Sequence, residues 1–283
     1  ERSPSAGPDP VCENGRLRRL QQPGTDLPFD RDPGASEQWD GSRGCVCGWG
    51  DGLLGAEYSY WSRVWTVPII EKFDGKKIMK RLERACRTCY RTEGVITDDS
   101  YKRILNNCIT AGHESVLEHE KITVRIYNDI GSYKDLTRHR FASFSVESTR
   151  FCSYNKDKFG NEITFINPQY IEDPQTYETW KETMQNIEKS YIKMKELGAS
   201  TDMCREVLPH STAAEYAMTA NIREWRHILS LRTTKNVHPS IRQVLIPLLK
   251  YFQEEMPELF GKIEYDREFK TEYYANLSVE EEF

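Results

Sequence analysis

A cluster of basic and hydroxyl side chains lies near the middle of the chain. Arg138, His139 and Arg140 are consecutive, and Ser148 and Arg150 follow after seven intervening residues. Guanidinium groups bind phosphate or carboxylate through paired hydrogen bonds, and a serine hydroxyl adds a neutral donor. Because the whole chain carries a net charge of −5, the cluster does not follow from a basic composition. The pattern predicts a site for an anionic ligand, most simply a phosphorylated one.

The alternative explanation for such a cluster is a solvated surface or a set of ion pairs. Apolar residues are interleaved with the cluster, and we expect them to pack the segment against a core: Phe141, Ala142, Phe144, Val146 and Phe151. An unpaired charge in a packed segment is costly, so arginines there need partners. This favours the anion site without deciding which anion binds.

Four stretches of the chain together resemble the flavin-dependent thymidylate synthases of the ThyX type. The first is the Arg-His-Arg, seven residues, Ser-x-Arg pattern at 138–150. The others agree with the family in order and spacing: GHESVLEH at 112–119, REVLP at 205–209, and TANIR at 219–223 followed by LR at 231–232. The resemblance covers residues 64–255.

The resemblance implies a binding site for deoxyuridine monophosphate (dUMP). The residues that match are Asp135, Arg138, Glu147, Ser148, Arg150, Arg205 and Arg232. Arg232 matches the arginine that stabilises the deprotonated uracil N3 in the family, so it is the candidate catalytic residue. Asp135 stands where many members have Gln or Glu, and Val146 replaces a polar residue. Ser148 is assigned to substrate binding because no neighbouring base is evident, with covalent catalysis as the alternative.

The resemblance also implies an FAD site, formed by Ser115, Glu118, Arg138, His139, Arg140, Asn221, Arg223 and His227. His227 stands where some members have Asn. NADPH would reduce FAD, 5,10-methylenetetrahydrofolate would supply the one-carbon unit, and dTMP would be the product. Family members are homotetramers with shared sites, and we expect the same here. The alternative is a homologue that binds flavin and nucleotide without turnover.

The remaining cysteines and histidines give weaker signals. Cys86 and Cys89 have redox or zinc spacing, but no second pair with metal-like spacing follows. On a helix, one face would hold Ile78, Leu82, Ala85 and Cys89, which favours core packing. His113 and His119 are six residues apart, a spacing that suits neither one helix face nor a standard zinc motif. We therefore expect no metal site.

Composition limits the class of protein. The 283 residues are 38% hydrophobic and 29% charged, as in a soluble globular protein with a sizeable core. No apolar run approaches the roughly 18 residues that a membrane span needs. The acidic net charge and the lack of a basic stripe with stacking aromatics argue against a nucleic-acid partner. We expect a cytoplasmic protein with reduced thiols and small-molecule substrates.

The chain divides into three parts by composition and pattern. Residues 1–63 are predicted to be a disordered or irregular extension, because residues 1–55 hold ten of the 17 Gly and six of the 13 Pro. The resemblance implies that residues 64–270 form a flavin-dependent thymidylate synthase domain. Residues 271–283 are predicted to be an acidic C-terminal tail.

Hydrophobic periodicity predicts a mixture of helices and strands. Helices are expected at 76–91, 97–111 and 173–198, within 131–140, after Asn221 and from Pro239 onward; strands are expected at 121–127, 162–166 and 216–220. Without a regular β-α-β alternation, this indicates an α+β domain with a mainly antiparallel sheet flanked by helices. The resemblance implies the thymidylate synthase-complementing protein fold.

Overall fold

A five-stranded sheet organises the part of the chain that the computed structural model describes, residues 66–150 and 163–281. The strands are β1 (Val67–Glu71), β2 (Lys121–Asp129), β3 (Ala142–Val146), β4 (Ala213–Asn221) and β5 (Ser278–Glu280). Their order is β3-β4-β2-β1-β5, and every neighbouring pair is antiparallel except β1 and β5. The predicted α+β class with a mainly antiparallel sheet is confirmed. The predictions for residues 1–63 and for Phe151 lie outside the described residues.

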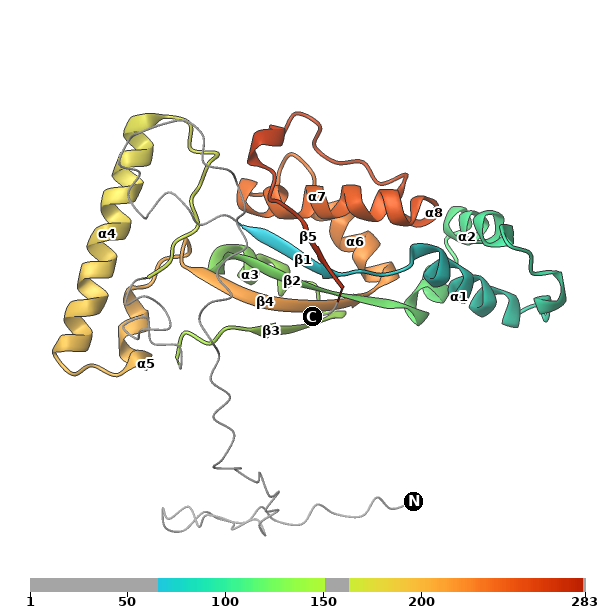
Figure 1. Cartoon of the computed structure of the whole chain (residues 1–283), viewed down its shortest axis with the longest axis horizontal. Coiled ribbons are helices and arrows are strands. Elements are labelled where there is room, and N and C mark those ends of the chain that lie inside the picture. The colour runs from blue at the N-terminus through green and yellow to red at the C-terminus, as the bar shows by residue number, and fades with distance from the viewer. Residues whose placement is uncertain (1–65, 151–162, 282–283) are drawn as a thin grey trace, which may run out of the picture. The chain divides into compact units, whose positions relative to one another are not determined.

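Eight α-helices accompany the sheet in the described residues. They are α1 (Gly75–Thr88), α2 (Ser100–Thr110), α3 (Ile130–Leu136), α4 (Pro174–Glu196), α5 (Thr201–Cys204), α6 (Ile222–Arg232), α7 (Pro239–Glu255) and α8 (Pro257–Phe260). Short 3-10 turns include η3 (Glu114–His119) and η5 (Arg205–Val207). Helices α6 and α7 lie on one side of the sheet; α4 and α5 lie beyond one end of the strands, and α1 and α2 beyond the other (Figure 1).

Capping residues fix the helix starts that matter for the site. The Asn221 side chain accepts a hydrogen bond from the backbone N–H of Glu224 at the start of α6. Asp173 caps α4 in the same way, with Pro174 in the first turn, and Pro239 opens α7. Each side-chain cap satisfies a backbone donor that the helix leaves without a partner. The helix starts predicted at these three positions are confirmed.

The two central strands pair over their full length and divide the sheet into unlike faces. Lys121 pairs with Asn221 at one end and Asp129 with Ala213 at the other. One face of β2 buries Ile122, Val124 and Ile126 against α6 and α7. The opposite face is polar and partly exposed, with an ion pair between Arg125 and Glu215. This alternation is the one that the sequence predicted for 121–127.

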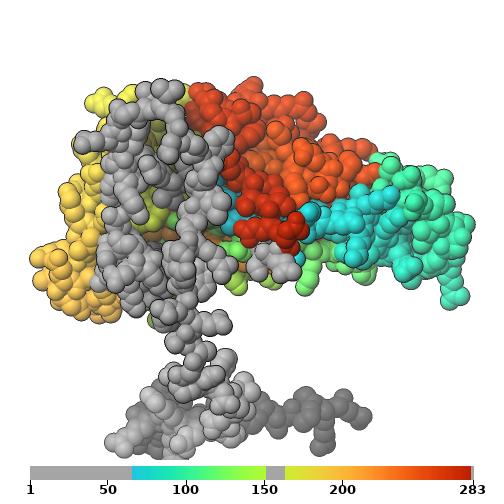
Figure 2. Space-filling model, in the orientation of Figure 1, coloured from blue at the N-terminus to red at the C-terminus, as the bar shows by residue number. Residues whose placement is uncertain are grey.

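The apolar stripe of α4 packs in a cluster separate from the main core. Met184 and Tyr191 are buried there with Ile163, Phe165 and Cys204. This packing holds the short helix α5 and the turn η5 near the start of β4. The space-filling view shows the C-terminal segment beside β1, with which β5 pairs (Figure 2).

Three local predictions are wrong. The strand expected at 162–166 is reduced, within the described residues, to an isolated bridge between Phe165 and Thr212. In α1, Cys86 lies on the buried face and Cys89 is exposed, because the buried face follows Ile78, Leu82 and Cys86.

The third error concerns the segment after the Arg-His-Arg triplet. Phe141 and Val146 were expected to pack, but they are 82% and 37% exposed. Val146 lies on β3, an edge strand with a single neighbour, and Phe141 lies in the turn that precedes this strand. Only Ala142 and Phe144 contact the core.

Candidate functional site

The guanidinium of Arg232 lies at the centre of a hydrogen-bonded group between α3 and α6. Its Nε donates to Nε2 of His139 at 3.0 Å, and its NH2 group donates to the backbone carbonyl of Asp135 at 3.0 Å. Nδ1 of His139 lies 3.2 Å from a carboxylate oxygen of Glu224. Arg232 is the last residue of α6 and Asp135 lies near the end of α3. The segment that contains Asp135 and His139 therefore fixes the side chain at the end of α6, 97 residues after Asp135.

The hydrogen bonds determine the tautomer of His139. A guanidinium only donates, so Nε2 of His139 must present a lone pair to Arg232. The ring proton then lies on Nδ1 and is donated to Glu224. Burial lowers the pKa of His139 to about 4, and the charges of Arg232 and His227 add to this effect. His139 is thus a neutral imidazole at physiological pH.

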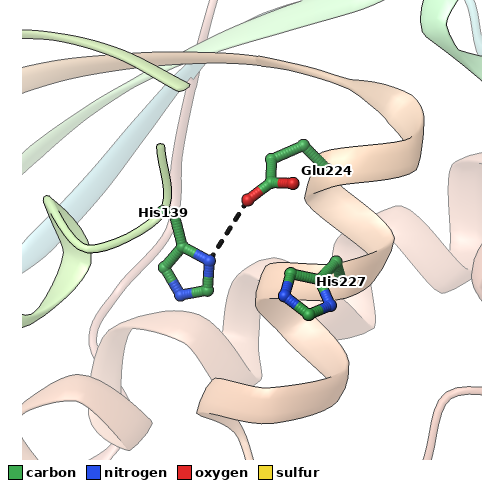
Figure 3. Close-up of side chains that lie close together, drawn as sticks. All are labelled: His139, Glu224 and His227. Carbon is green, nitrogen blue, oxygen red and sulfur yellow. Dashed lines mark hydrogen bonds and ion pairs between the residues drawn. The ribbon is translucent and has the colours of Figure 1, made fainter. Parts of the chain in front are cut away.

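His227 completes the surroundings of the imidazole. It lies one turn after Glu224 on α6, and its ring meets the ring of His139 edge to face at a centroid distance of 5.7 Å (Figure 3). Ligand atoms of His139, Glu224 and His227 all lie within 4.8 Å of one another, a spacing that a metal ion would accept. However, Arg232 already holds a positive charge 3.0 Å from the same ring, which makes a second cation there unfavourable. Hydrogen bonding explains the group better than metal ligation.

The arginines on either side of His139 differ from it in environment. Arg138 and Arg140 are exposed, whereas His139 is buried. Neither arginine has a hydrogen bond or ion pair to any other residue in 66–150 or 163–281. Two cations therefore flank the buried imidazole without a counter-charge from the described part of the chain, which suits an anionic ligand.

The GHES stretch lies beside the start of α6. Arg223 donates to Glu118 at 2.6 Å, and Arg226 donates to Glu114 at 3.2 Å. Ser115 is exposed in the same turn. The structure thus brings predicted cofactor residues from η3 and α6 together, although Asn221 contributes its side-chain oxygen to the helix cap.

A second group of predicted residues lies at the other end of β3. Arg150 donates to Asp202 at 2.9 Å, and Nε of Arg205 lies 3.7 Å from the same carboxylate. All three side chains are at least 40% exposed. Two arginines from distant segments therefore converge on one carboxylate, in an arrangement open to water.

Glu147 and Ser148 connect this second group to the sheet. The backbone N–H of Glu147 donates to the carbonyl of Glu215 at 2.9 Å, which continues the β3–β4 ladder. One carboxylate oxygen of Glu147 is buried and has no partner among the described residues. Buried polar atoms without partners are uncommon in folded proteins, so this oxygen marks a place where a ligand donor would be satisfied.

Strand β3 separates the two groups. Ala142 pairs with Ala220 near the start of α6, and Val146 pairs with Tyr216 nearer α5. At about 3.3 Å per residue, the chain advances about 17 Å between Ala142 and Glu147. Within one chain, β3 thus has Arg138–Arg140 at one end and Ser148–Arg150 at the other.

Two residues of these groups were missed by sequence reasoning. Glu224 was interpreted only as the partner of the Asn221 cap, and its contact with His139 spans 85 residues. Asp202 lies two residues after Ser200 and belongs to none of the motifs. A separate hollow of about 470 Å³ is lined by residues of α2, α8 and the following loop, and it contains none of the predicted site residues.

Residues 73–258 match the family described as thymidylate synthase complementing protein. The chain is 32% identical to the flavin-dependent thymidylate synthase of Pyrococcus abyssi and 33% identical to that of Thermococcus kodakarensis, over 55% and 56% of this chain and 64% and 65% of those proteins. It is 28% identical to the enzyme of the same name from Corynebacterium diphtheriae, over 65% of this chain and 78% of the relative.

The extent of these matches is limited. The chain spans less than two thirds of the length of the two archaeal relatives. Within the described ranges, no helix combines the length and apolar composition needed to cross a membrane.

Proposed function

The chain belongs to the thymidylate synthase complementing protein family, and on that premise we propose that it converts dUMP to dTMP in a flavin-dependent reaction. FAD would be the cofactor, 5,10-methylenetetrahydrofolate the one-carbon donor and NADPH the reductant. The relatives named flavin-dependent thymidylate synthase support this proposal. The structural observation that carries it is the fixed orientation of Arg232.

Arg232 can act on the uracil ring through its unused donors. A guanidinium has five N–H donors, and those to His139 and to the carbonyl of Asp135 use two. The remaining donors can meet the N3 and carbonyl oxygens of a pyrimidine. A fixed cation beside N3 favours the deprotonated ring, which is richer in electrons at C5, the carbon that receives the methyl group. The orientation is present before substrate binds, so little reorganisation is needed.

The residues near the Arg-His-Arg triplet fit an FAD. Arg138 and Arg140 are exposed cations with no partner in the described ranges, and Arg223 and the amide of Asn221 lie on the neighbouring helix start. These donors suit a pyrophosphate and the isoalloxazine carbonyls. When bound, the flavin supplies the hydride chemistry, while the protein binds and orients the reactants.

The second group suits the phosphate of dUMP. Arg150 and Arg205 already share one carboxylate, and a phosphate dianion could replace Asp202 as their counter-charge. Ser148 would add a neutral donor. Glu147, with its unpaired buried oxygen, could accept a hydrogen bond from the ligand.

We further propose that the working unit is a homotetramer with shared sites. A dUMP molecule is too short to span the two groups along β3, so the Ser148–Arg150 end of one subunit would meet the Arg232 end of another. Exposed Phe141 and Leu231, next to the triplet and to Arg232, would be covered in such an assembly. We propose small-molecule substrates, no nucleic-acid partner and a cytoplasmic location.

A direct assay tests the proposed function. Purified protein would be incubated with FAD, NADPH, methylenetetrahydrofolate and dUMP tritiated at C5, and tritium release and dTMP would be measured. Release with dTMP formation, both dependent on FAD and NADPH, is expected. A protein that binds flavin and dUMP without release would instead be the inactive homologue, and one that binds neither would contradict the proposal.

A further inference from the structure

Glu224 is a buried carboxylate that the proposed binding roles leave unused. Its residue is 7% exposed, and its side chain points from the first turn of α6 towards His139 (Figure 3). A Glu at this helix position usually reaches back to the cap residue, but here the side chain turns inward. The positive end of the α6 dipole stabilises the carboxylate at this position. The side-chain partner of its carboxylate is Nδ1 of His139.

The hydrogen bonds form a directed chain from Arg232 to Glu224. Arg232 donates to Nε2 of His139, and Nδ1 of His139 donates to Glu224. If the proton moved to Nε2, two N–H groups would face each other at 3.0 Å and Arg232 would lose an acceptor. Glu224 can only accept, so it favours the Nδ1–H tautomer. Both ends of the chain therefore select the same tautomer.

The position of the guanidinium depends on that tautomer. The carbonyl of Asp135 holds one terminal nitrogen of Arg232, and His139 holds Nε. With both acceptors in place, the guanidinium plane is fixed. Without the lone pair on Nε2, one acceptor remains, and the planar group is free to rotate about it.

We propose that Glu224 is a positioning residue that fixes the tautomer of His139 and, through it, the orientation of Arg232 towards the substrate ring. The expected effect of Glu224 on turnover rests on the proposed function. The tautomer of His139 and the geometry of Arg232 do not depend on that function. The same logic orients histidines in other catalytic sites, where a carboxylate on one ring nitrogen sets the state of the other.

Two variants of Glu224 with similar volume separate the positioning role from packing. Glu224→Gln keeps an acceptor oxygen for Nδ1–H, whereas Glu224→Met removes it. We expect Glu224→Met to lower kcat for dTMP about 10- to 100-fold, by analogy with the loss of the hydrogen-bond partners that orient histidines in metal sites. Glu224→Gln should recover most of the turnover. FAD content should stay close to that of the parent in both, because the proposed FAD donors are on other side chains.

A structural readout tests the proposal without relying on turnover. Neutron diffraction of the full chain should place the ring deuteron of His139 on Nδ1, and crystals of Glu224→Met should show Arg232 rotated from the Asp135–His139 position. A deuteron on Nε2, or an unmoved Arg232 with parental kcat in Glu224→Met, would overturn the proposal. If the parent makes no dTMP, the proposed function fails, while the deuteron position still decides the role of Glu224.

Discussion

The two arginine groups of the site differ in how their charges are held. Arg232 is fixed by a buried histidine and a backbone carbonyl, whereas Arg150 and Arg205 share the exposed carboxylate of Asp202. Partners of the first group are neutral acceptors that a ligand cannot displace. Asp202, which the second group shares, is an anion that another anion can replace. The first arrangement suits orientation of a reacting ring, and the second suits capture of a charged substrate.

Because the two groups differ in burial, we expect them to respond differently to salt and to pH. Salt screens charges at the surface and affects buried groups much less. A buried titratable residue, by contrast, makes stability depend on pH. We therefore expect pH to act mainly through the His139 group and salt mainly through the Asp202 group.

The largest expected effect is that of Arg232→Ala. Removing a donor that stabilises a developing anion lowers kcat by about 10²- to 10³-fold, and we expect a loss of that size in dTMP formation. FAD should remain bound, as measured by its absorbance after gel filtration. Turnover within a few-fold of the parent would contradict the role of Arg232.

The next effect is the pH dependence of stability from His139. Its pKa of about 4 lies below the value of about 6.5 for a free histidine. At a pH between these two pKa values, His139 is protonated in the unfolded chain and neutral in the folded chain. The His139 contribution to the free energy of unfolding therefore decreases as the pH falls from about 6.5 to 4, by roughly 3 kcal/mol.

The titration of Glu224 opposes this loss of stability, and a variant of Glu224 provides the control. Burial raises the pKa of Glu224, so the folded chain takes up this proton at a higher pH than the unfolded chain. Its contribution to stability therefore increases as the pH falls. Denaturant unfolding at pH 7 and pH 5 should show a steeper loss for Glu224→Gln than for the parent. Parallel profiles would contradict the uptake of a proton by Glu224 at a higher pH in the folded chain than in the unfolded chain.

Arg150→Ala should have a smaller effect, and on substrate binding. Losing a charge-assisted hydrogen bond of about 1.5 kcal/mol raises the KM for dUMP roughly tenfold, with little change in kcat. The effect should shrink as salt increases, because Arg150 is exposed. A fall in kcat at unchanged KM would assign Arg150 to the chemistry instead.

The smallest effect, and one of opposite sign, is expected for Asp202→Asn. An exposed ion pair contributes about 0.2–1 kcal/mol, so removing the charge of Asp202 beside Arg150 and Arg205 should lower the KM for dUMP by up to about fivefold. Asp99→Asn is a matched control, since Asp99 forms an exposed pair with Lys102 elsewhere. Weaker dUMP binding in Asp202→Asn would show that Asp202 supports the arginines rather than competing with the phosphate.

Local signals predicted much of the fold. Caps and first-turn prolines mark where α4, α6 and α7 begin, because they satisfy donors or fix dihedral angles within a few residues. Strand β2 was predicted because apolar and polar residues alternate along it. The exposure of Phe141 and Val146 was not, because sequence alone does not say which strand will lie at an edge.

The site was predicted less completely. The motifs give Arg232, His139, Arg150 and Arg205 as candidate site residues, but motif spacing says nothing about which side chains meet. The Arg232–His139 bond joins residues 93 apart, and the Arg150–Asp202 bond joins residues 52 apart. Asp202 and the role of Glu224 depend on such long-range contacts, so only the folded structure reveals them.

Mixed oligomers test most directly whether one dTMP-forming site combines these two regions from different subunits. Arg232→Ala and Arg150→Ala chains, each with its own tag, would be co-expressed and purified through both tags. If each site takes Arg232 from one subunit and Arg150 from another, random mixing leaves about a quarter of the sites intact in a symmetric oligomer. The account predicts dTMP formation near that level at low dUMP, well above either variant alone. Activity no higher than the average of the two variants would contradict it.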